Sequence, residues 1–372
     1  MVHLCKVTLD DATVGWGEQT QKGATDEQVQ RVIGGSPAML MNDDSISVCL
    51  QMALWDAVSR ALGVPCHALL GTKLRDATPI SWWVQSASPE DWAAECADAV
   101  AAGYTTCKVK ARPWWDVVEQ VRVVSDAVPA GFHLDLDFNE TLQNVAVATS
   151  VIRQLEPFEN VAFIESPIKQ ADAAGNAALR CAVRRPTAGH FGTPPHATVV
   201  KDQVFDGYVI GGGKETILRQ AALSADAGLP FWLQMIGAGL TTAWCAHLGA
   251  VLSHASWPTI TCVNLFTTTL LTPETDICVV DGYQAVPDSP GLGVEVDEAM
   301  VRGLDGEGLF PPARVIFTAV SPSGGRIHFA QTETKTPGIA AVREPAPDLT
   351  CSVSLSRTTV SVCLTLPHAL SC

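Results

Sequence analysis

The sequence is poor in basic residues. Its 24 lysines and arginines stand against 39 aspartates and glutamates, which gives a formal net charge of −15. Such a chain is a poor electrostatic partner for nucleic acid or for an anionic membrane, so we expect neither among its partners. The same acidity permits a divalent cation, because some of the carboxylates can converge on one ion.

The sequence also lacks a membrane-spanning run of about 18 apolar residues, since polar side chains interrupt the best candidate between residues 241 and 254. No signal-peptide core follows Met1, so we expect a soluble, cytoplasmic protein. None of the twelve cysteines forms a CxxC pair. We interpret them as small buried apolar side chains, in particular Cys49, Cys107, Cys245 and Cys262, which lie in apolar runs.

Strand-like and helix-like stretches alternate regularly from about residue 79. Eight such units predict an α/β protein with a (β/α)8 TIM-type barrel. A doubly wound open sheet is the alternative, but no GxGxxG motif or P-loop follows the first strand. The predicted strands cover residues 80–85, 105–110, 132–137, 161–165, 186–190, 206–210, 231–235 and 259–263.

The first part of the chain does not follow this alternation. Residues 7–18 predict a β-hairpin, and residues 44–62 predict an amphipathic helix that ends at Gly63. The pattern of this segment therefore predicts a small α+β unit before the barrel.

The last part of the chain changes pattern again. Residues 314–320 and 326–330 predict one more hairpin, while the residues from about 334 onward suggest no element. We divide the chain into this α+β unit (1–75), the barrel (76–290), a segment that contains the second hairpin (291–333) and a tail without assigned role (334–372).

Two lysines end the second predicted barrel strand, as Lys108-Val109-Lys110. Alternation along a strand places both lysines on one face. Inward lysines are costly in a barrel interior unless they serve a purpose, and two neighbouring ammonium groups lower each other's pKa, which creates a usable base. A solvent-facing pair with Val109 buried is the alternative that the spacing leaves open.

Acids end the next two strands. Asp137 closes residues 132–137 and Glu165 closes residues 161–165. Carboxylates at consecutive strand ends beside the two lysines are suited to bind a hard cation such as Mg²⁺. A third ligand is expected from the following strand, where His190 is the candidate.

Short motifs follow one another between about residues 7 and 330. They are Gly15-Trp-Gly-Glu18, Ala53-Leu-Trp-Asp56, Gly63-Val-Pro65 with Leu69-Leu-Gly71, Lys108-Val-Lys110, Asp137-Phe-Asn139, Ile164-Glu-Ser-Pro167, Gly211-Gly-Gly213 and Pro290-Gly-Leu-Gly293. In this set and order the chain resembles the enolase superfamily, in its mandelate racemase/muconate-lactonizing branch. The resemblance implies an α+β capping domain, formed from both chain ends (residues 1–75 and a return at 291–333), over a modified TIM barrel.

The resemblance also implies a chemistry. Family members remove the proton α to a carboxylate and stabilise the resulting enediolate on Mg²⁺. By resemblance Asp137 and Glu165 are metal ligands, Lys110 is the acid/base and Lys108 tunes it. His190 stands where the family usually has an acid. Because imidazole is a softer ligand, Mn²⁺ or another transition ion would suit the site better than Mg²⁺.

Groups expected on the other face of the substrate are missing. The strand at 206–210 has no lysine, and no histidine–aspartate pair of the mandelate racemase type is evident. A one-sided site favours syn elimination of water, with Lys110 removing the α-proton and returning it to the departing hydroxyl. We therefore predict a dehydratase (a lyase) for a small hydroxy- or amino-carboxylate, similar to cis-3-hydroxy-L-proline dehydratase.

Two alternatives stay open. One is a racemase or epimerase that uses Lys214, Gln234 or another group on the second face. The other is a degenerate, non-catalytic member, because the family's first capping strand and its closing loop are expected before residue 1. Family likeness also suggests a homo-oligomer.

Overall fold

Eight parallel strands form the centre of the computed structural model, which describes residues 2–20, 23–266, 270–304, 314–320, 326–331, 339–342 and 364–366. The strands β3 to β9 are neighbours in chain order, a bridge between Gln234 and Ile260 continues to β10, and β10 pairs with β3. The predicted barrel is thus confirmed. Its strands are β3 (Ala77–Val84), β4 (Thr106–Lys110), β5 (His133–Asp137), β6 (Val161–Glu165), β7 (Thr187–His190), β8 (Gly207–Ile210), β9 (Phe231–Leu233) and β10 (Thr259–Ile260).

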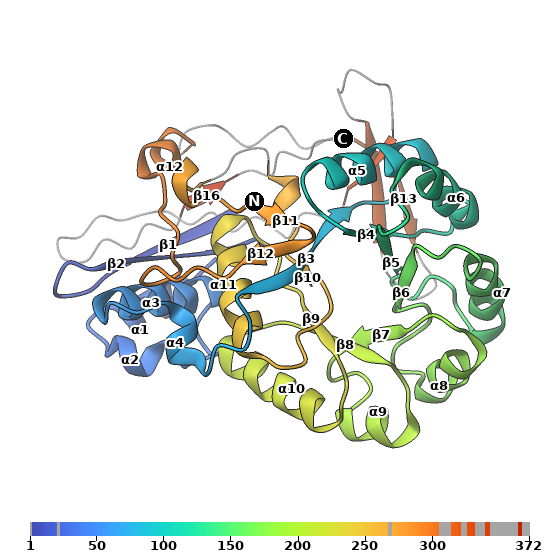
Figure 1. The fold of residues 1–372 in the computed structure, drawn as a ribbon. Coiled ribbons are helices and arrows are strands. Elements are labelled where there is room, and N and C mark those ends of the chain that lie inside the picture. Colours follow the sequence, from blue (N-terminus) through green and yellow to red (C-terminus); the bar gives the residue numbers. More distant parts are fainter. Residues whose placement is uncertain are drawn as a thin grey trace.

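A helix follows each strand from β3 to β9 and covers the outside of the barrel (Figure 1). The first of these helices has a typical start, since the Ser88 side chain accepts a hydrogen bond from the Asp91 amide and Pro89 occupies the first turn. Nowhere in the described ranges is a helix long and apolar enough to cross a membrane. These helices are α5 (Pro89–Ala101), α6 (Val117–Ala127), α7 (Val145–Leu155), α8 (Ala173–Ala182), α9 (His196–Asp202), α10 (Lys214–Asp226) and α11 (Gly239–Val251), and the 3-10 helix η1 (Val263–Leu265) follows β10.

The two tryptophans of β3 point to opposite sides of the barrel wall, as strand alternation requires. Trp82 faces outward, where its indole N–H donates to Glu95 and its ring packs edge-on against Tyr104. Trp83 packs inside the barrel, against an apolar cluster that includes the buried Trp232. Aromatic rings and the apolar side chains around them therefore fill part of the barrel interior.

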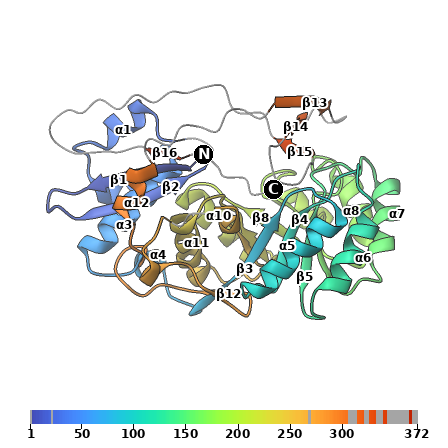
Figure 2. The same ribbon diagram turned by 90° about the horizontal axis from the view of Figure 1, so that it is seen from above.

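The capping unit packs beside the barrel (Figures 1 and 2). The predicted hairpin is confirmed as β1 (Val2–Thr8) and β2 (Val14–Gln19), and the predicted helix as α3 (Val48–Ala61). Close packing of β2 on α3 depends on glycine, because a Cβ on Gly17 would lie 2.1 Å from the Cys49 carbonyl oxygen. The unit also contains α1 (Asp26–Val32), α2 (Pro37–Leu40) and α4 (Cys66–Leu70).

Asp56 of α3 joins three segments that are distant in the sequence. One carboxylate oxygen accepts a hydrogen bond from the Trp16 amide at 2.8 Å, and the other accepts from the Leu292 amide at 2.8 Å and from Arg60 Nε at 2.9 Å. Burial raises the pKa of Asp56, against the opposing charge of Arg60. Three of the sequence motifs thus meet at one carboxylate.

The chain after the barrel supplies several short elements. Strands β13 and β14 are antiparallel, which confirms the predicted hairpin, and β15 extends that sheet. Strand β16 pairs with β1 in the capping unit. Two strands therefore lie in the segment for which the sequence suggested no element. The elements are η2 (Pro273–Thr275), β11 (Val279–Val280), β12 (Tyr283–Ala285), α12 (Glu298–Leu304), β13 (Arg314–Val320), β14 (Arg326–Gln331), β15 (Ile339–Val342) and β16 (Leu364–Leu366).

The prediction of small buried cysteines holds for most of the described ones, but it is wrong for Cys181 and Cys278, which are exposed, and it missed a disulfide. Cys107, Cys245 and Cys262 are buried free thiols. Cys49 is buried too, but it forms a disulfide with Cys5, so its interpretation as a free apolar side chain was wrong. The reason is tertiary, because β1 packs against α3 and brings together two residues separated by 44 positions.

Candidate active site

The predicted lysines and acids meet at the carboxyl edge of the barrel. Lys110 on β4 is in register with Asp137 on β5, which is in register with Glu165 on β6. One pleat deeper, Lys108 is in register with Asp135. Lys108 is fully buried, so the solvent-facing alternative is wrong for this residue.

Lys108 lies among three carboxylates. Its Nζ contacts a carboxylate oxygen of Glu165 and lies 3.6 Å from Asp137 Oδ2 and 3.7 Å from Asp135 Oδ2. It also donates to Gln234 Oε1 at 3.0 Å and stands 5.2 Å above the Trp232 ring. The ammonium of this lysine is thus held by carboxylate and amide acceptors and by a ring face.

Lys110 occupies the upper layer, nearer the mouth. Its Nζ contacts Asp137, and its side chain keeps 18% of its surface exposed, whereas that of Lys108 has none. Lys110 is therefore the lysine that a molecule entering the mouth can reach.

The charges shift the pKa values of this group in ways that the sequence did not predict. Burial alone would lower the pKa of Lys108, but Glu165, Asp135 and Asp137 raise it above its ordinary value. The predicted lowering by the second lysine is therefore wrong for Lys108, because three nearby anions outweigh one neighbouring cation.

The pKa values of the two acids on β5 shift in opposite directions. Burial tends to raise the pKa of Asp137, but Lys110 and Lys108 bring it well below its usual range. Burial raises the pKa of Asp135 to about 8; Lys108 opposes this rise, and Glu165 and Asp137 add to it. Asp137 is thus a firmly ionised carboxylate, whereas the charge of Asp135 is opposed by burial and favoured by the Lys108 ammonium.

The end of β5 is held in place by its neighbours. The Asn139 amide donates to Asp137 Oδ1 at 2.9 Å, and Arg112 donates to the Asp137 carbonyl oxygen at 3.1 Å and to the Asn139 side chain. Asn139 has φ of +44°, a left-handed conformation that asparagine adopts more readily than most residues. The Asp-Phe-Asn motif therefore orients the Asp137 carboxylate.

His190 ends β7 beside these acids. Its Nε2 lies 3.3 Å from Glu165 Oε1, and 44% of its side chain is exposed. That Glu165 oxygen is buried and accepts no hydrogen bond. The donor chemistry of Asp137, Glu165 and His190 fits a divalent cation, since it offers buried carboxylate oxygens and an imidazole nitrogen. In the described part of the chain, however, no three such groups are already arranged around one ion.

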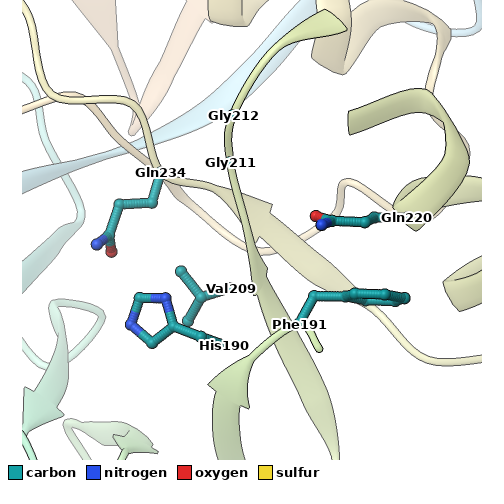
Figure 3. A pocket seen from close by; sticks show the side chains of 7 residues that line it. All are labelled: His190, Phe191, Val209, Gly211, Gly212, Gln220 and Gln234. Atoms are coloured by element: carbon teal, nitrogen blue, oxygen red, sulfur yellow. The ribbon is translucent and has the colours of Figure 1, made fainter. Parts of the chain in front are cut away.

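A cavity of about 220 Å³ opens next to His190, at the end of β8. Figure 3 shows His190 and Gln234 on one side of this strand, and Phe191 and Gln220 on the other. Gly211 follows β8 directly, and because a Cβ at this position would lie 2.5 Å from the Gln234 carbonyl oxygen, glycine permits the close approach of these two backbone segments. The lining residues are His190, Phe191, Val209, Gly211, Gly212, Gln220 and Gln234.

Three further residues were either missed by the sequence analysis or named there only as alternatives. Asp135 was not predicted to take part, although its position two residues before Asp137 places it on the same strand face. Gln234 does reach the site, through Lys108. Lys214 does not, because its Nζ contacts Glu215 and stands 5.1 Å above the Trp55 ring of the capping unit.

Comparison of the sequence with known proteins gives consistent matches. The model of the family described as "Enolase C-terminal domain-like" matches residues 91–300. A D-galactonate dehydratase from Xanthomonas axonopodis pv. citri is 26% identical over 344 residues, covering 80% of this chain and 89% of that relative. Another D-galactonate dehydratase, from Ralstonia nicotianae, is 24% identical over 353 residues with the same coverage of both chains.

Solved structures show the same fold. Muconate cycloisomerase from Pseudomonas fluorescens superposes with a TM-score of 0.69 at 22% identity, over 81% of this chain and 93% of that one. A mandelate racemase/muconate lactonizing family protein from Azoarcus sp. EbN1 gives 0.67 at 24% identity, over 82% and 97%. N-succinyl Arg/Lys racemase from Bacillus cereus gives 0.67 at 18% identity, over 82% and 96%.

Proposed function

Because this chain belongs to the enolase superfamily, in its mandelate racemase/muconate-lactonizing branch, we propose that it is a metal-dependent dehydratase acting on a small hydroxy- or amino-carboxylate. The D-galactonate dehydratases among its relatives support the reaction type. The racemase among its structural neighbours has the same fold, so the choice between the two reactions depends on the site.

Lys110 is the proposed acid/base. As the free amine, its Nζ takes the α-proton of the substrate and becomes an ammonium. The same ammonium then gives that proton to the β-hydroxyl, which leaves as water while a double bond forms between the α- and β-carbons. Lys110 ends the cycle as an amine, and no redox partner is needed.

Asp137, Glu165 and His190 are the proposed ligands of a divalent cation, Mg²⁺ or, given the imidazole, Mn²⁺. When bound, such an ion would stabilise the negative charge that develops on the substrate carboxylate as the α-proton leaves. The chain contributes the orientation: Arg112 and the Asn139 amide hold the end of β5 and aim the Asp137 carboxylate.

The observation that carries the choice of reaction is the one-sided arrangement of the site. Lys110 stands on β4, and the cavity across the mouth is lined at β8 and β9 by Val209, Gly211 and Gln234. Of the described lining residues, His190 alone has an acid/base side chain, and we assign it to the cation. Inversion at the α-carbon needs proton carriers on both faces, whereas syn elimination needs one, so this arrangement favours dehydration.

The cavity also indicates which functional groups the rest of the substrate carries. Gln234 and Gln220 present amides to it, and the Gln220 Oε1 atom is buried without a hydrogen-bond donor. An amide oxygen in this state is suited to a substrate hydroxyl or amine. A hydroxylated or amino-bearing carboxylate therefore fits better than a purely apolar acid.

The test is to incubate the full chain with Mg²⁺ or Mn²⁺ in D₂O and to follow the α-proton of each candidate by NMR. The panel contains sugar acids, including D-galactonate, and the 3-hydroxyprolines. Loss of water from one acid would support the proposal. Exchange with inversion and without elimination would replace it by a racemase, and the absence of both metal binding and exchange would indicate a non-catalytic member.

A further inference from the structure

Asp135 is a buried carboxylate for which the proposed reaction has no use. It lies on the inner face of β5, one pleat below Asp137, and only 3% of its surface is exposed. Both of its carboxylate oxygens are buried without a hydrogen-bond donor. Its nearest cationic partner is Lys108, at 3.7 Å. Burying a carboxylate so poorly satisfied is costly, so its presence calls for a physical reason.

The position of Lys108 supplies a physical reason for the buried Asp135 carboxylate. Its ammonium contacts Glu165 and lies 3.6 Å from Asp137, the two carboxylates that the proposed function assigns to a divalent cation. An ammonium and a divalent cation repel each other strongly at such short range in a buried site. The cation can therefore bind only if the Lys108 ammonium leaves Glu165.

We propose that Asp135 is a positioning residue, the counter-ion that receives the Lys108 ammonium when a divalent cation takes Asp137 and Glu165. This inference rests on the proposed function. The shift needed is small, because Asp135 Oδ2 is already 3.7 Å from Lys108 Nζ. Gln234 and the Trp232 ring, which hold the same ammonium from other directions, can guide it.

The proposal predicts how variants bind metal in the absence of substrate. Asp135→Asn keeps the shape of the side chain but removes its charge, so the displaced ammonium has no anion to meet. Mn²⁺ affinity should then fall about 10- to 100-fold, as is typical when an outer partner of a metal site is lost. Lys108→Met removes the ammonium itself and should bind Mn²⁺ more tightly than the native chain.

The double variant Asp135→Asn/Lys108→Met tests whether Asp135 acts through Lys108. If it does, Asp135→Asn costs little Mn²⁺ affinity once Lys108 is gone. If Asp135 merely attracts the cation through space, the loss of affinity is the same in both backgrounds. A general folding defect would also appear in both backgrounds, so this coupling separates positioning from structural damage.

The experiment titrates Mn²⁺ into the full-length native chain and these three variants, followed by electron paramagnetic resonance and calorimetry, with circular dichroism to confirm folding. Asp98→Asn on the exposed face of α5 is the matched control and should bind like the native chain. Asp135→Ser replaces Asp135→Asn if the latter does not fold.

The outcomes separate the two proposals. A native chain that binds no Mn²⁺ overturns the proposed metal site, and this inference with it. Normal binding by the native chain and unchanged binding by Asp135→Asn overturn the counter-ion role alone, as does an equal loss with and without Lys108. Weaker binding by Asp135→Asn that disappears in the Lys108→Met background supports it.

Discussion

Glu18 is a buried carboxylate at the junction of the capping unit and the barrel, and its ionisation should oppose folding. It lies near the end of β2, is 1% exposed, and accepts a hydrogen bond from the Thr241 amide at 2.7 Å, in the first turn of α11. Its other oxygen has no donor. Burial raises the pKa of Glu18 from 4.5 to about 7, although backbone amides of Ala238, Leu240 and Thr241 oppose the rise.

The sign of the effect follows from this direction. Below the unfolded pKa of 4.5, Glu18 is protonated in both states and carries no penalty. Between 4.5 and about 7 the folded chain holds a proton that the unfolded chain has lost, so the free energy of unfolding falls as the pH rises. The full effect is about 3 kcal/mol, of which about 2 kcal/mol falls between pH 5.5 and pH 8.

Urea unfolding of the native chain and of Glu18→Gln, at pH 5.5 and at pH 8, measures this contribution. Both conditions lie above the isoelectric point near 4.9, which helps to keep the chain soluble. The native chain should lose about 2 kcal/mol more than Glu18→Gln between the two conditions. Other titrating groups, such as His247, contribute equally to both proteins and cancel in the difference.

The control is Glu27→Gln on the exposed start of α1, which should follow the native chain at both pH values. An equal loss in the native chain and in Glu18→Gln would refute the reasoning, because it would mean that Glu18 is not shifted by burial.

Three further predictions concern the proposed base Lys110, the capping unit and the proposed metal ligand His190. Lys110→Ala should reduce α-proton exchange in D₂O by about 10²- to 10⁴-fold. The control is Lys201→Ala, since the Lys201 side chain on α9 is 83% exposed, and this variant should exchange like the native chain. If exchange survives in Lys110→Ala, Lys110 is not the base. Asp56→Ala should lower the free energy of unfolding, measured by urea denaturation, by about 4 kcal/mol, because it leaves two buried amides without acceptors. A loss below about 1 kcal/mol would show that Asp56 does not stabilise the contact between these segments. His190→Ala should weaken Mn²⁺ binding about tenfold or more in calorimetry, and unchanged affinity would remove His190 from the ligand set.

Much of the architecture could be predicted from local pattern. All eight barrel strands lie where the alternation of strand-like and helix-like stretches places them, with ends shifted by a few residues. Strand periodicity also predicted that Lys108 and Lys110 share a face, because side chains along a strand alternate whatever surrounds them. The acids Asp137 and Glu165 were found for a related reason, since the carboxyl ends of parallel strands meet at one edge.

The electrostatic behaviour of the site could not be predicted in the same way. From the sequence, Lys108 has one charged neighbour, Lys110, and that pair alone would lower its pKa. In the fold, three carboxylates from β5 and β6 surround it and raise that pKa. Asp135 belongs to this group only because parallel pairing sets it opposite Lys108.

Long-range pairing explains the remaining differences. The Cys5–Cys49 disulfide, the β16–β1 pair and the hydrogen bonds of Asp56 to Trp16 and Leu292 all join parts that are far apart in the sequence. The sequence by itself determined which residues share a strand face and where strands end, because these depend on local backbone geometry. Only the tertiary structure decided which charges meet and what each pKa becomes, because burial and Coulomb interactions depend on neighbours that the chain brings together by folding.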